Sequence, residues 1–454
     1  MLVTMLGLAL AADPPPEIKF EKYALPNGLE VLLSPDHRLP LVAVDIWYHV
    51  GAGYEVPGRS GFAHLFEHIM FQGSKNVPED QYFPMLEGAG ATFVNGTTDF
   101  DRTNYLETVP QNQLELALWL ESDRMGWLLD TLTQDRLDNQ KKVVRKERQQ
   151  STENVPYGVA EEQFYKLLFP APHPYNGVVI GTHEDLEAAT LEDIKAFFKT
   201  WYLPNNATLV VAGDFDESTV KATIEKYFGA IPGGAEPKAT TQMAPPIAAE
   251  KRASFTDDVE LPKVYLGWVT PPVFAEGDAQ LQLGAMVLAD GKSSRMYREL
   301  IEKKQLAQSV KAYQYPLTYG SIFAVEIIGK PGQTPARLEA EAWQVIEGMR
   351  AAPASQAEVD RAWRGTKARV LRGLEELGGF AGRADTLNYY NHHTGDPGYI
   401  AKDFARYEST TPEMIQAAFS AHLRKDNRVV IDVTPIPTTP APKTPAPAAE
   451  GGAK

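Results

Sequence analysis

Two histidines and one glutamate lie close together in residues 61–70, where the chain contains the pattern His64-x-x-Glu67-His68. The apolar residues between them favour a helix, with Ser60 as its predicted N-cap. Residues four apart share one face of a helix, so His64 and His68 would point the same way and could bind one metal ion. Zn2+ suits this pair, because it accepts imidazole nitrogens in a tetrahedral site. Glu67 would then lie beside the metal as a general base, able to take a proton from a zinc-bound water.

A short motif of this kind also fits an amphipathic helix with two surface histidines, so a second observation is needed. It comes from the charged helix predicted over residues 135–150. One stripe of this helix carries four residues spaced three, four and three apart: Leu137, Gln140, Val144 and Glu147. A carboxylate on an apolar stripe needs a partner, and a metal ion is one. The alternative is a glutamate at the edge of the stripe that reaches water.

The composition limits the classes of function. The chain of 454 residues carries a net charge of −15. Nucleic-acid binding depends on contacts between positive side chains and phosphates, so we expect no nucleic-acid partner. The chain has no cysteine, which excludes disulfides, thiolate metal ligands and a cysteine nucleophile. No stretch beyond the N-terminal residues approaches the ~18 apolar residues of a membrane span.

The first residues of the chain resemble the end of a targeting segment. The apolar residues 1–12 end in Ala9-Leu10-Ala11-Ala12, and an aspartate and three prolines follow. An apolar run followed by small residues and a proline break is typical of the end of a secretory signal peptide. We therefore expect residues 1–12 to be a signal peptide remnant and the protein to be periplasmic or otherwise exported. A cationic start is missing, and a cytoplasmic location is the alternative.

A second pattern indicates an internal duplication. Six residues recur 221 positions later (411 − 190), in two segments that each run from a capped helix into a strand. The pairs are Thr190 and Thr411, Glu192 and Glu413, Ile194 and Ile415, Ala196 and Ala417, Phe198 and Phe419, and Asn206 and Asn427. A repeat of this length indicates a duplicated domain. The alternative is chance similarity between two amphipathic helices.

The chain length and the duplication together predict two domains. We expect an N-terminal domain over residues 17–232, which would carry the zinc site, and a homologous C-terminal domain over residues 257–435. Residues 233–256 are rich in Pro, Gly, Ala and Thr and are predicted to be a linker. Residues 436–454 are rich in Pro, Thr and Ala and are predicted to be a disordered tail.

These residues resemble the pitrilysin superfamily of zinc peptidases, whose inverted motif is His-x-x-Glu-His. Within it, the chain is similar to the branch of the mitochondrial processing peptidase and its bacterial relatives, over about residues 18–435. The resemblance implies that His64 and His68 bind Zn2+, that Glu67 is the base, and that a glutamate of a later helix is the third ligand. Glu147 lies 79 residues after His68 (147 − 68), which matches that ligand.

The resemblance also implies an α+β fold of two similar domains, each an antiparallel or mixed sheet with helices on one face. Together they would form half of a clamshell around a closed chamber. Peptides would bind by pairing with an edge strand near the metal. Asn95, Gly96 and Thr98 match that strand as substrate-binding residues, although Asn95 could also be a turn residue. Gln140 stands where many relatives carry a second glutamate, and it would hydrogen-bond near the metal without adding charge.

The second half departs from the family pattern. Relatives with a complete site place an arginine and, seven residues later, a tyrosine, which bind substrate and stabilise the oxyanion; here Ile301 and Gln308 occupy these positions. Loss of one oxyanion donor typically costs ~10²–10³-fold in rate. We therefore expect the zinc-bearing subunit of a heterodimeric peptidase, whose homologous partner supplies the arginine and tyrosine. A non-catalytic scaffold subunit and a self-sufficient homodimeric peptidase are the alternatives.

Overall fold

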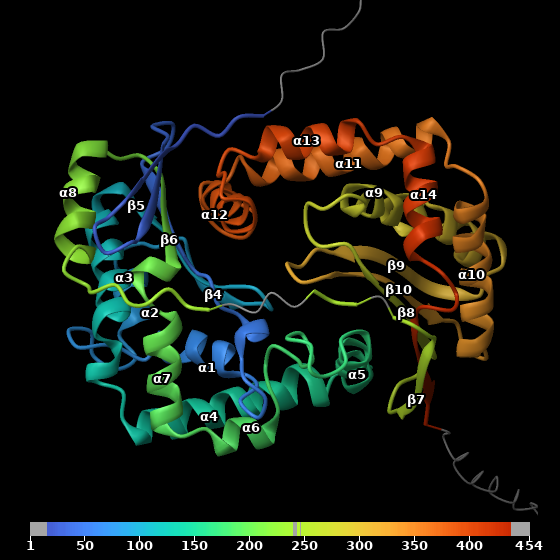
Figure 1. The fold of residues 1–454 in the computed structure, drawn as a ribbon, viewed down its shortest axis with the longest axis horizontal. Helices are drawn as coiled ribbons and strands as arrows, with labels where there is room; N and C mark the ends of the chain where they lie inside the picture. The colour runs from blue at the N-terminus through green and yellow to red at the C-terminus, as the bar shows by residue number, and fades with distance from the viewer. Residues whose placement is uncertain (1–15, 239–242, 246, 437–454) are drawn as a thin grey trace, which may run out of the picture.

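The computed structural model describes residues 16–238, 243–245 and 247–436 of the chain. Two halves lie side by side, and each is built on one β-sheet with its own group of helices (Figure 1). The strands of the first half are β1 (Glu21–Ala24), β2 (Glu30–Pro35), β3 (Leu41–Tyr48), β4 (Phe93–Thr98), β5 (Thr103–Pro110) and β6 (Ala207–Gly213). Its helices are α1 (Phe62–Ile69), α2 (Tyr82–Gly88), α3 (Leu114–Trp127), α4 (Gln134–Arg148), α5 (Gly158–Leu168), α6 (His183–Ala188), α7 (Leu191–Trp201) and α8 (Glu217–Phe228).

The first sheet has six strands in the order β1-β2-β6-β3-β5-β4. β2 and β6 run parallel, and every other neighbouring pair is antiparallel. The central strands β3 and β6 are buried almost throughout, as expected of strands that are covered on both faces. β4 lies at the edge, so one side of its backbone has no strand partner among the described residues.

The second half repeats this arrangement. Its strands are β7 (Lys251–Asp257), β8 (Lys263–Thr270), β9 (Ala307–Tyr315), β10 (Ser321–Gly329) and β11 (Val429–Pro435). Its helices are α9 (Asp278–Ala289), α10 (Pro335–Ala351), α11 (Gln356–Gly373), α12 (Arg383–Thr394), α13 (Ile400–Glu408) and α14 (Pro412–His422), with a π-helical segment at Tyr297–Lys303. The sheet order is β7-β11-β8-β10-β9, and only β7 and β11 run parallel.

Strand for strand, this order matches β2, β6, β3, β5 and β4 of the first sheet. The side chains of Thr190 and Thr411 each cap a helix, α7 and α14, and these helices lead into the corresponding strands β6 and β11. The predicted α+β fold with two duplicated domains is therefore confirmed.

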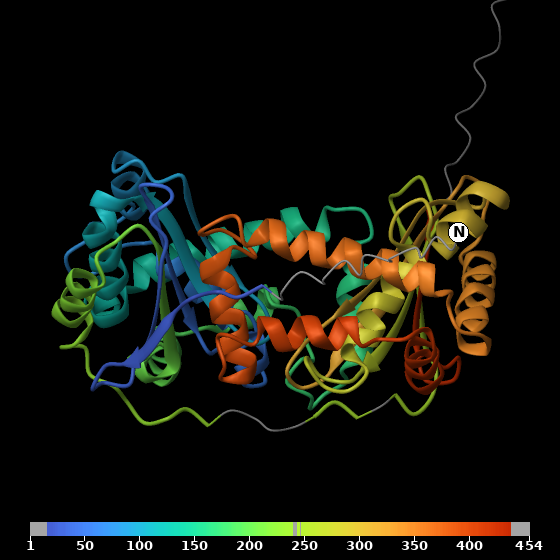
Figure 2. The ribbon, with the colours of Figure 1, turned by 90° about the horizontal axis from the view of Figure 1, so that it is seen from above.

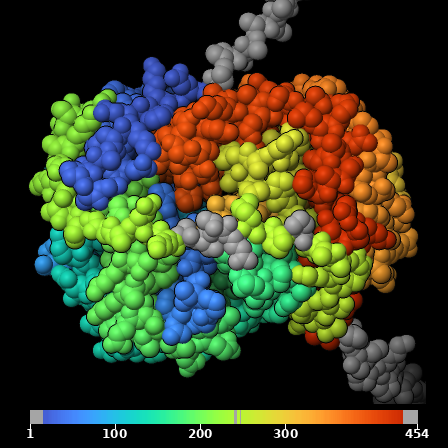
Figure 3. Space-filling view, in the orientation of Figure 1, coloured from blue at the N-terminus to red at the C-terminus, as the bar shows by residue number. Residues whose placement is uncertain are grey.

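The two halves exchange one helix each. α5 of the first half packs on the second sheet, where Phe164 joins a buried cluster with Tyr265. α12 of the second half packs on the first sheet, where Leu387 joins a buried cluster with Val210. Each sheet is thus covered by its own helices on one face and by a helix of the other half on the opposite face. Figure 3 shows the orange-red C-terminal helices in direct contact with the blue N-terminal strands.

One predicted boundary is wrong, because residues 251–256 belong to β7 rather than to the linker expected over 233–256. Burial alternates along this segment as in a strand, and it pairs with β11 in the way that β2 pairs with β6. The predicted signal remnant (1–12) and all but the first residue of the predicted tail (436–454) lie outside the described residues. None of the helices in the described part of the chain combines the length and apolar character that crossing a membrane requires.

Candidate metal centre

Helices α1 and α4 lie against each other and bring together the three residues expected to bind a metal. The Nε2 atoms of His64 and His68 lie 3.6 and 3.1 Å from Oε1 and Oε2 of Glu147, respectively. One possible ligand atom of each residue lies within 4.8 Å of the others, and no other such group of metal-ligating side chains occurs in the described part of the chain. Ligands of a tetrahedral Zn2+ stand about 3.3 Å apart. The two distances between histidine and glutamate are close to this value.

The surroundings favour the protonation states that bind a metal. Burial, together with the neighbouring His68, lowers the pKa of His64 to about 4, so its imidazole is neutral at pH 7. A hydrogen bond with His68 lowers the pKa of Glu147, which keeps this carboxylate ionised. Two imidazoles and one carboxylate form a donor set that Zn2+ accepts, with a fourth position left for water or substrate. The residues present therefore fit the metal.

Glu67 lies on the same helix as the two histidines, and β4 holds its side chain. Its Oε2 accepts a hydrogen bond of 2.7 Å from the hydroxyl of Thr98. Gly96 lies against the stem of the side chain, since a Cβ added at Gly96 would lie 3.0 Å from Cγ of Glu67. Burial raises the pKa of Glu67, which brings it closer to that of a base working at neutral pH. The strand therefore positions the carboxylate beside the candidate metal ligands.

A cavity of about 470 Å³ opens beside Glu67 and His68. Asn95 of β4 lines one part of it, and the apolar side chains of Phe71 and Phe83 line another. The cavity thus borders the candidate metal site, the candidate base and the edge strand at once, as a peptide-binding site requires.

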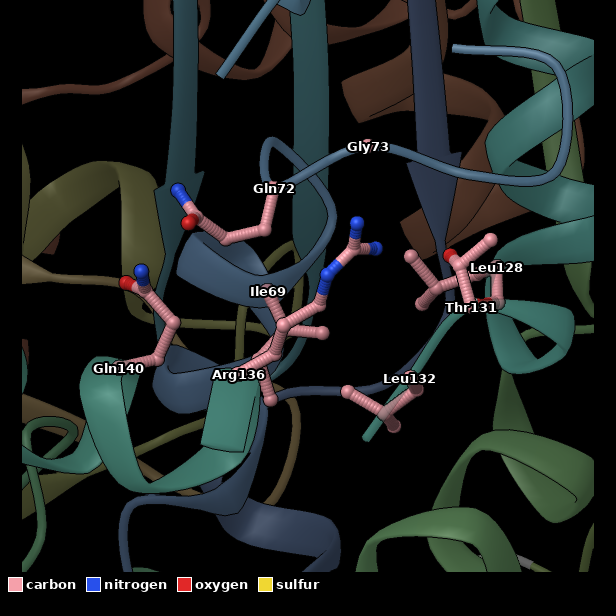
Figure 4. A pocket seen from close by; sticks show the side chains of 8 residues that line it. All are labelled: Ile69, Gln72, Gly73, Leu128, Thr131, Leu132, Arg136 and Gln140. Atoms are coloured by element: carbon pink, nitrogen blue, oxygen red, sulfur yellow. The ribbon is translucent and has the colours of Figure 1, made fainter. Parts of the chain in front are cut away.

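Gln140 lines the same cavity from α4 and is buried. A shallow pocket next to it lies at the end of α1 (Figure 4), and Ile69 and Arg136 are among its lining residues. In Figure 4 the amides of Gln72 and Gln140 lie on the same side of this pocket. Gln140 is therefore near the three converging side chains without being one of them, and its role beside the metal stays a prediction.

The backbone of β4 directs polar groups toward the open edge of the sheet. The N–H of Asp99 donates to the carbonyl of Arg102, and hydrogen-bonded pairs alternate along antiparallel strands. By this alternation the N–H and C=O of Gly96 point away from β5, toward the open edge. The side-chain oxygen of Asn95 accepts a hydrogen bond of 2.9 Å from this N–H. An edge strand with outward-facing backbone groups is what strand addition by a peptide requires.

The N-terminus of α1 differs from the expectation. Its N-cap is Gly61, with a φ of 85°, whereas the hydroxyl of Ser60 donates to Asp185. Glu55 provides the cap instead, because its carboxylate accepts hydrogen bonds from the N–H groups of Gly61 and Ala63 at 2.8 and 2.9 Å. Burial raises the pKa of Glu55 to about 8. Sequence reasoning missed this residue because it sought the cap immediately before the helix; the available signal was an acid near a helix N-terminus.

The two residues that depart from the family pattern lie in the second half. Ile301 belongs to the π-helical segment and packs against the apolar core of the second half. Gln308 is exposed on β9, the edge strand that corresponds to β4. Neither side chain carries a positive charge or a phenol hydroxyl, so neither can take the place of the arginine or the tyrosine.

Comparisons with known proteins identify one family. The model of Insulinase (Peptidase family M16) matches residues 30–170, and that of the Peptidase M16 inactive domain matches residues 188–365. The zinc protease PqqE of Helicobacter pylori is 31% identical over 368 residues, which cover 80% of this chain and 82% of that protein. The crystal structure of a protease from Helicobacter pylori has a TM-score of 0.86 at 27% identity, covering 92% of this chain and 100% of that one.

A structure titled as the peptidase M16 inactive domain from Pseudomonas fluorescens shows the same fold, with a TM-score of 0.81 at 20% identity. It covers 92% of this chain and 98% of its own. Two family models, a relative above 30% identity and the shared fold lead to one conclusion. The chain belongs to the M16 (insulinase) family, within the pitrilysin superfamily of zinc peptidases.

Proposed function

We propose that the chain is the zinc-bearing subunit of a zinc-dependent endopeptidase that hydrolyses peptides or unfolded protein segments. The observation that carries this proposal is the convergence of His64, His68 and Glu147 beside Glu67, at a cavity bordered by an edge strand. The Helicobacter pylori relative is named a zinc protease, which supports the same reaction. In strand addition the enzyme hydrogen-bonds to the backbone of the peptide, and in a folded protein these backbone groups are already paired. Extended chains are therefore the substrates.

The three converging side chains would hold Zn2+, which when bound polarises a peptide carbonyl and lowers the pKa of a nearby water. Glu67 takes a proton from the attacking water, while the hydroxyl of Thr98 keeps the carboxylate oriented. The same carboxyl group then gives this proton to the leaving amine, which balances the hydrolysis. The peptide lies as an added strand along β4, so that its scissile bond is level with Gly96 and faces Glu67.

The proposal includes a homologous partner subunit that supplies the arginine and tyrosine of a complete site. Ile301 cannot donate a hydrogen bond to an oxyanion, and Gln308 can offer only a neutral amide. A partner with the same two-domain fold would also close the open half of the chamber. Both requirements are met by one heterodimer.

The substitution Glu67→Gln tests the reaction. Bound zinc should persist, because Glu67 is not a ligand, whereas peptide hydrolysis should fall by ~10²–10⁴-fold. Elemental analysis and the rate of cleavage of a fluorogenic peptide are measured on the same preparation. If wild-type protein with its partner hydrolyses no faster than the variant, the chain is a non-catalytic scaffold subunit.

Measuring peptide hydrolysis by the purified chain alone tests whether a partner subunit is required for activity. We expect weak activity alone and a large recovery when the homologous subunit, co-purified from the native host, is added. Strong turnover without a second chain would overturn the divided site and favour a self-sufficient homodimer.

We also propose that the protein is exported, because residues 1–12 are apolar and end in small residues before a proline break. Fractionation of the native host should then recover the chain outside the cytoplasm. Recovery in the cytoplasmic fraction would contradict this.

A further inference from the structure

The turn between α11 and α12 reaches from the second half onto the first sheet (Figure 2). Gly378 in this turn lies against Ala43, since a Cβ added at Gly378 would lie 2.8 Å from the Cβ of Ala43. Phe380 follows and packs edge to face on Phe93 of β4, with ring centroids 5.5 Å apart and an interplanar angle of 89°. The turn therefore extends to the open edge of the sheet.

The residues beneath the turn form one row across three strands. Ala43 of β3 pairs with Thr108 of β5, and Thr108 pairs with Phe93 of β4. Paired residues of neighbouring strands place their side chains on the same face, about 5 Å apart. Phe93 ends this row, because β4 is the last strand of the sheet. A strand added to β4 would place its next side chain in the row, beside Phe380.

Phe380 has free surface for such a contact, because 56% of the residue is exposed. A single exposed apolar side chain is common on protein surfaces. This ring differs in its position, since it borders the edge at which the peptide would bind and already packs on a strand residue. An aromatic ring held in this way can cover a second apolar side chain at a favourable edge or face.

Alternation along β4 sets the spacing of the site. Gly96 and Thr98 face Glu67, whereas Phe93, an odd number of residues from Gly96, faces the turn. We propose that Phe380 and Phe93 form a side-chain site for the peptide substrate that selects a large apolar residue. This residue lies three positions from the one level with Gly96, at about 10 Å. The site rests on the proposed function, because it requires a peptide strand on β4.

The substitution Phe380→Ala tests this site in the full-length chain, assayed with its partner subunit. The peptides carry Phe or Ser at the third or the fourth residue on either side of the scissile bond, because either residue of that bond can be the one level with Gly96, and kcat and KM are measured for each. We expect the wild-type protein to favour Phe over Ser by ~10-fold in kcat/KM on one side, chiefly through KM, and Phe380→Ala to bring this ratio near one. The control Met414→Ala, which shortens an exposed apolar side chain of α14, should keep the wild-type ratio.

Two kinetic results would overturn the site: a ratio that Phe380→Ala leaves at the wild-type value, or a wild-type ratio near one on both sides. A binding assay distinguishes failure of this side-chain site from failure of the proposed peptidase function. Fluorescence anisotropy of the same peptides, with Glu67→Gln and with Glu67→Gln/Phe380→Ala, reports the preference without hydrolysis. A preference that the double variant loses supports the site even if no peptide is cleaved. Equal binding of the Phe and Ser peptides, or no binding at all, overturns it.

Discussion

The substitution Gly96→Ala would test whether β4 sets the position of the general base. A Cβ at Gly96 would lie 3.0 Å from Cγ of Glu67 and 3.0 Å from Cε2 of Phe71. Carbon atoms in contact prefer about 3.5–4.0 Å, so one or both neighbours must move by about 0.5 Å. The added methyl group therefore acts directly on the stem of the base.

The surroundings decide which neighbour moves. The ring of Phe71 is held by the rings of Tyr82 and Tyr105, at centroid distances of 5.2 and 5.5 Å, and by the guanidinium of Arg124. Glu67 has fewer constraints and should take most of the shift. The hydrogen bond from Thr98, now 2.7 Å, would lengthen toward about 3.2 Å, the weak end of the normal range.

We expect kcat to fall by ~10–100-fold, because sub-ångström to ångström misplacement of a catalytic group has costs of this order. KM should change little, since the new methyl group points toward α1 and leaves the outer backbone of β4 free. Zinc content should be unchanged, because the three atoms nearest to the added Cβ belong to Glu67 and Phe71 and not to a candidate ligand.

The assay is steady-state hydrolysis of a fluorogenic peptide, with zinc content and thermal unfolding measured on the same samples. Gly348→Ala is the matched control, because a Cβ at this helical position of α10 meets nothing within 4 Å. It should leave kcat unchanged and stabilise the fold by ~0.5–1 kcal/mol. If Gly96→Ala keeps kcat within twofold of wild type while remaining folded, contact with β4 does not position Glu67.

Two further predictions concern the candidate ligand and the cap of α1. Glu147→Gln should weaken zinc binding by more than ~100-fold, because changes to residues that only support the ligands already cost up to that much. Competition with a chromogenic chelator measures the affinity, and an unchanged affinity would show that Glu147 is not a ligand. Burial raises the pKa of Glu55 from 4.5 to about 8, so between these values the unfolded chain binds fewer protons than the folded one. The free energy of unfolding of the metal-free protein should therefore fall as pH rises from about 4.5 to about 8, with a contribution from this group of at most ~1.4 kcal/mol per pH unit. Glu55→Gln should remove that contribution, and urea unfolding at pH 5, 6.5 and 8 compares the slopes; equal slopes in both proteins would contradict the raised pKa.

Local periodicity was sufficient for the parts of the site that lie on single elements. His64, Glu67 and His68 fall within about one helical turn, so their mutual positions follow from helix geometry alone. The spacing of Glu147 to Val144 and Gln140 on α4 placed it on the apolar stripe, but left open whether it points inward or reaches water. That α1 and α4 face each other did not follow from either pattern, and the pairing of the two helices came from the resemblance to the family.

Contacts between distant segments were beyond such reasoning. Ser60 met the local rule for a cap, yet Asp185 engages its hydroxyl and Glu55 reaches the helix across a loop. The duplication could be predicted, because each helix-to-strand segment is recognisable from its own residues. The identical residues at matching positions then related the two segments to each other. An apolar stripe shows that a helix such as α5 or α12 must be buried, but it does not show which sheet buries it.

The crossing of α5 and α12 between the halves has a consequence for how such a chain can be divided. If the connecting segment before β7 were cut, the two fragments would stay associated, because each fragment still covers the sheet of the other with one helix. Either fragment alone would expose one face of its sheet to solvent. The exposed side chains would include Leu32, Ala43 and Val210 in the first fragment and Tyr265 in the second. The present chain has the arrangement of a domain-swapped homodimer whose two copies have been fused end to end.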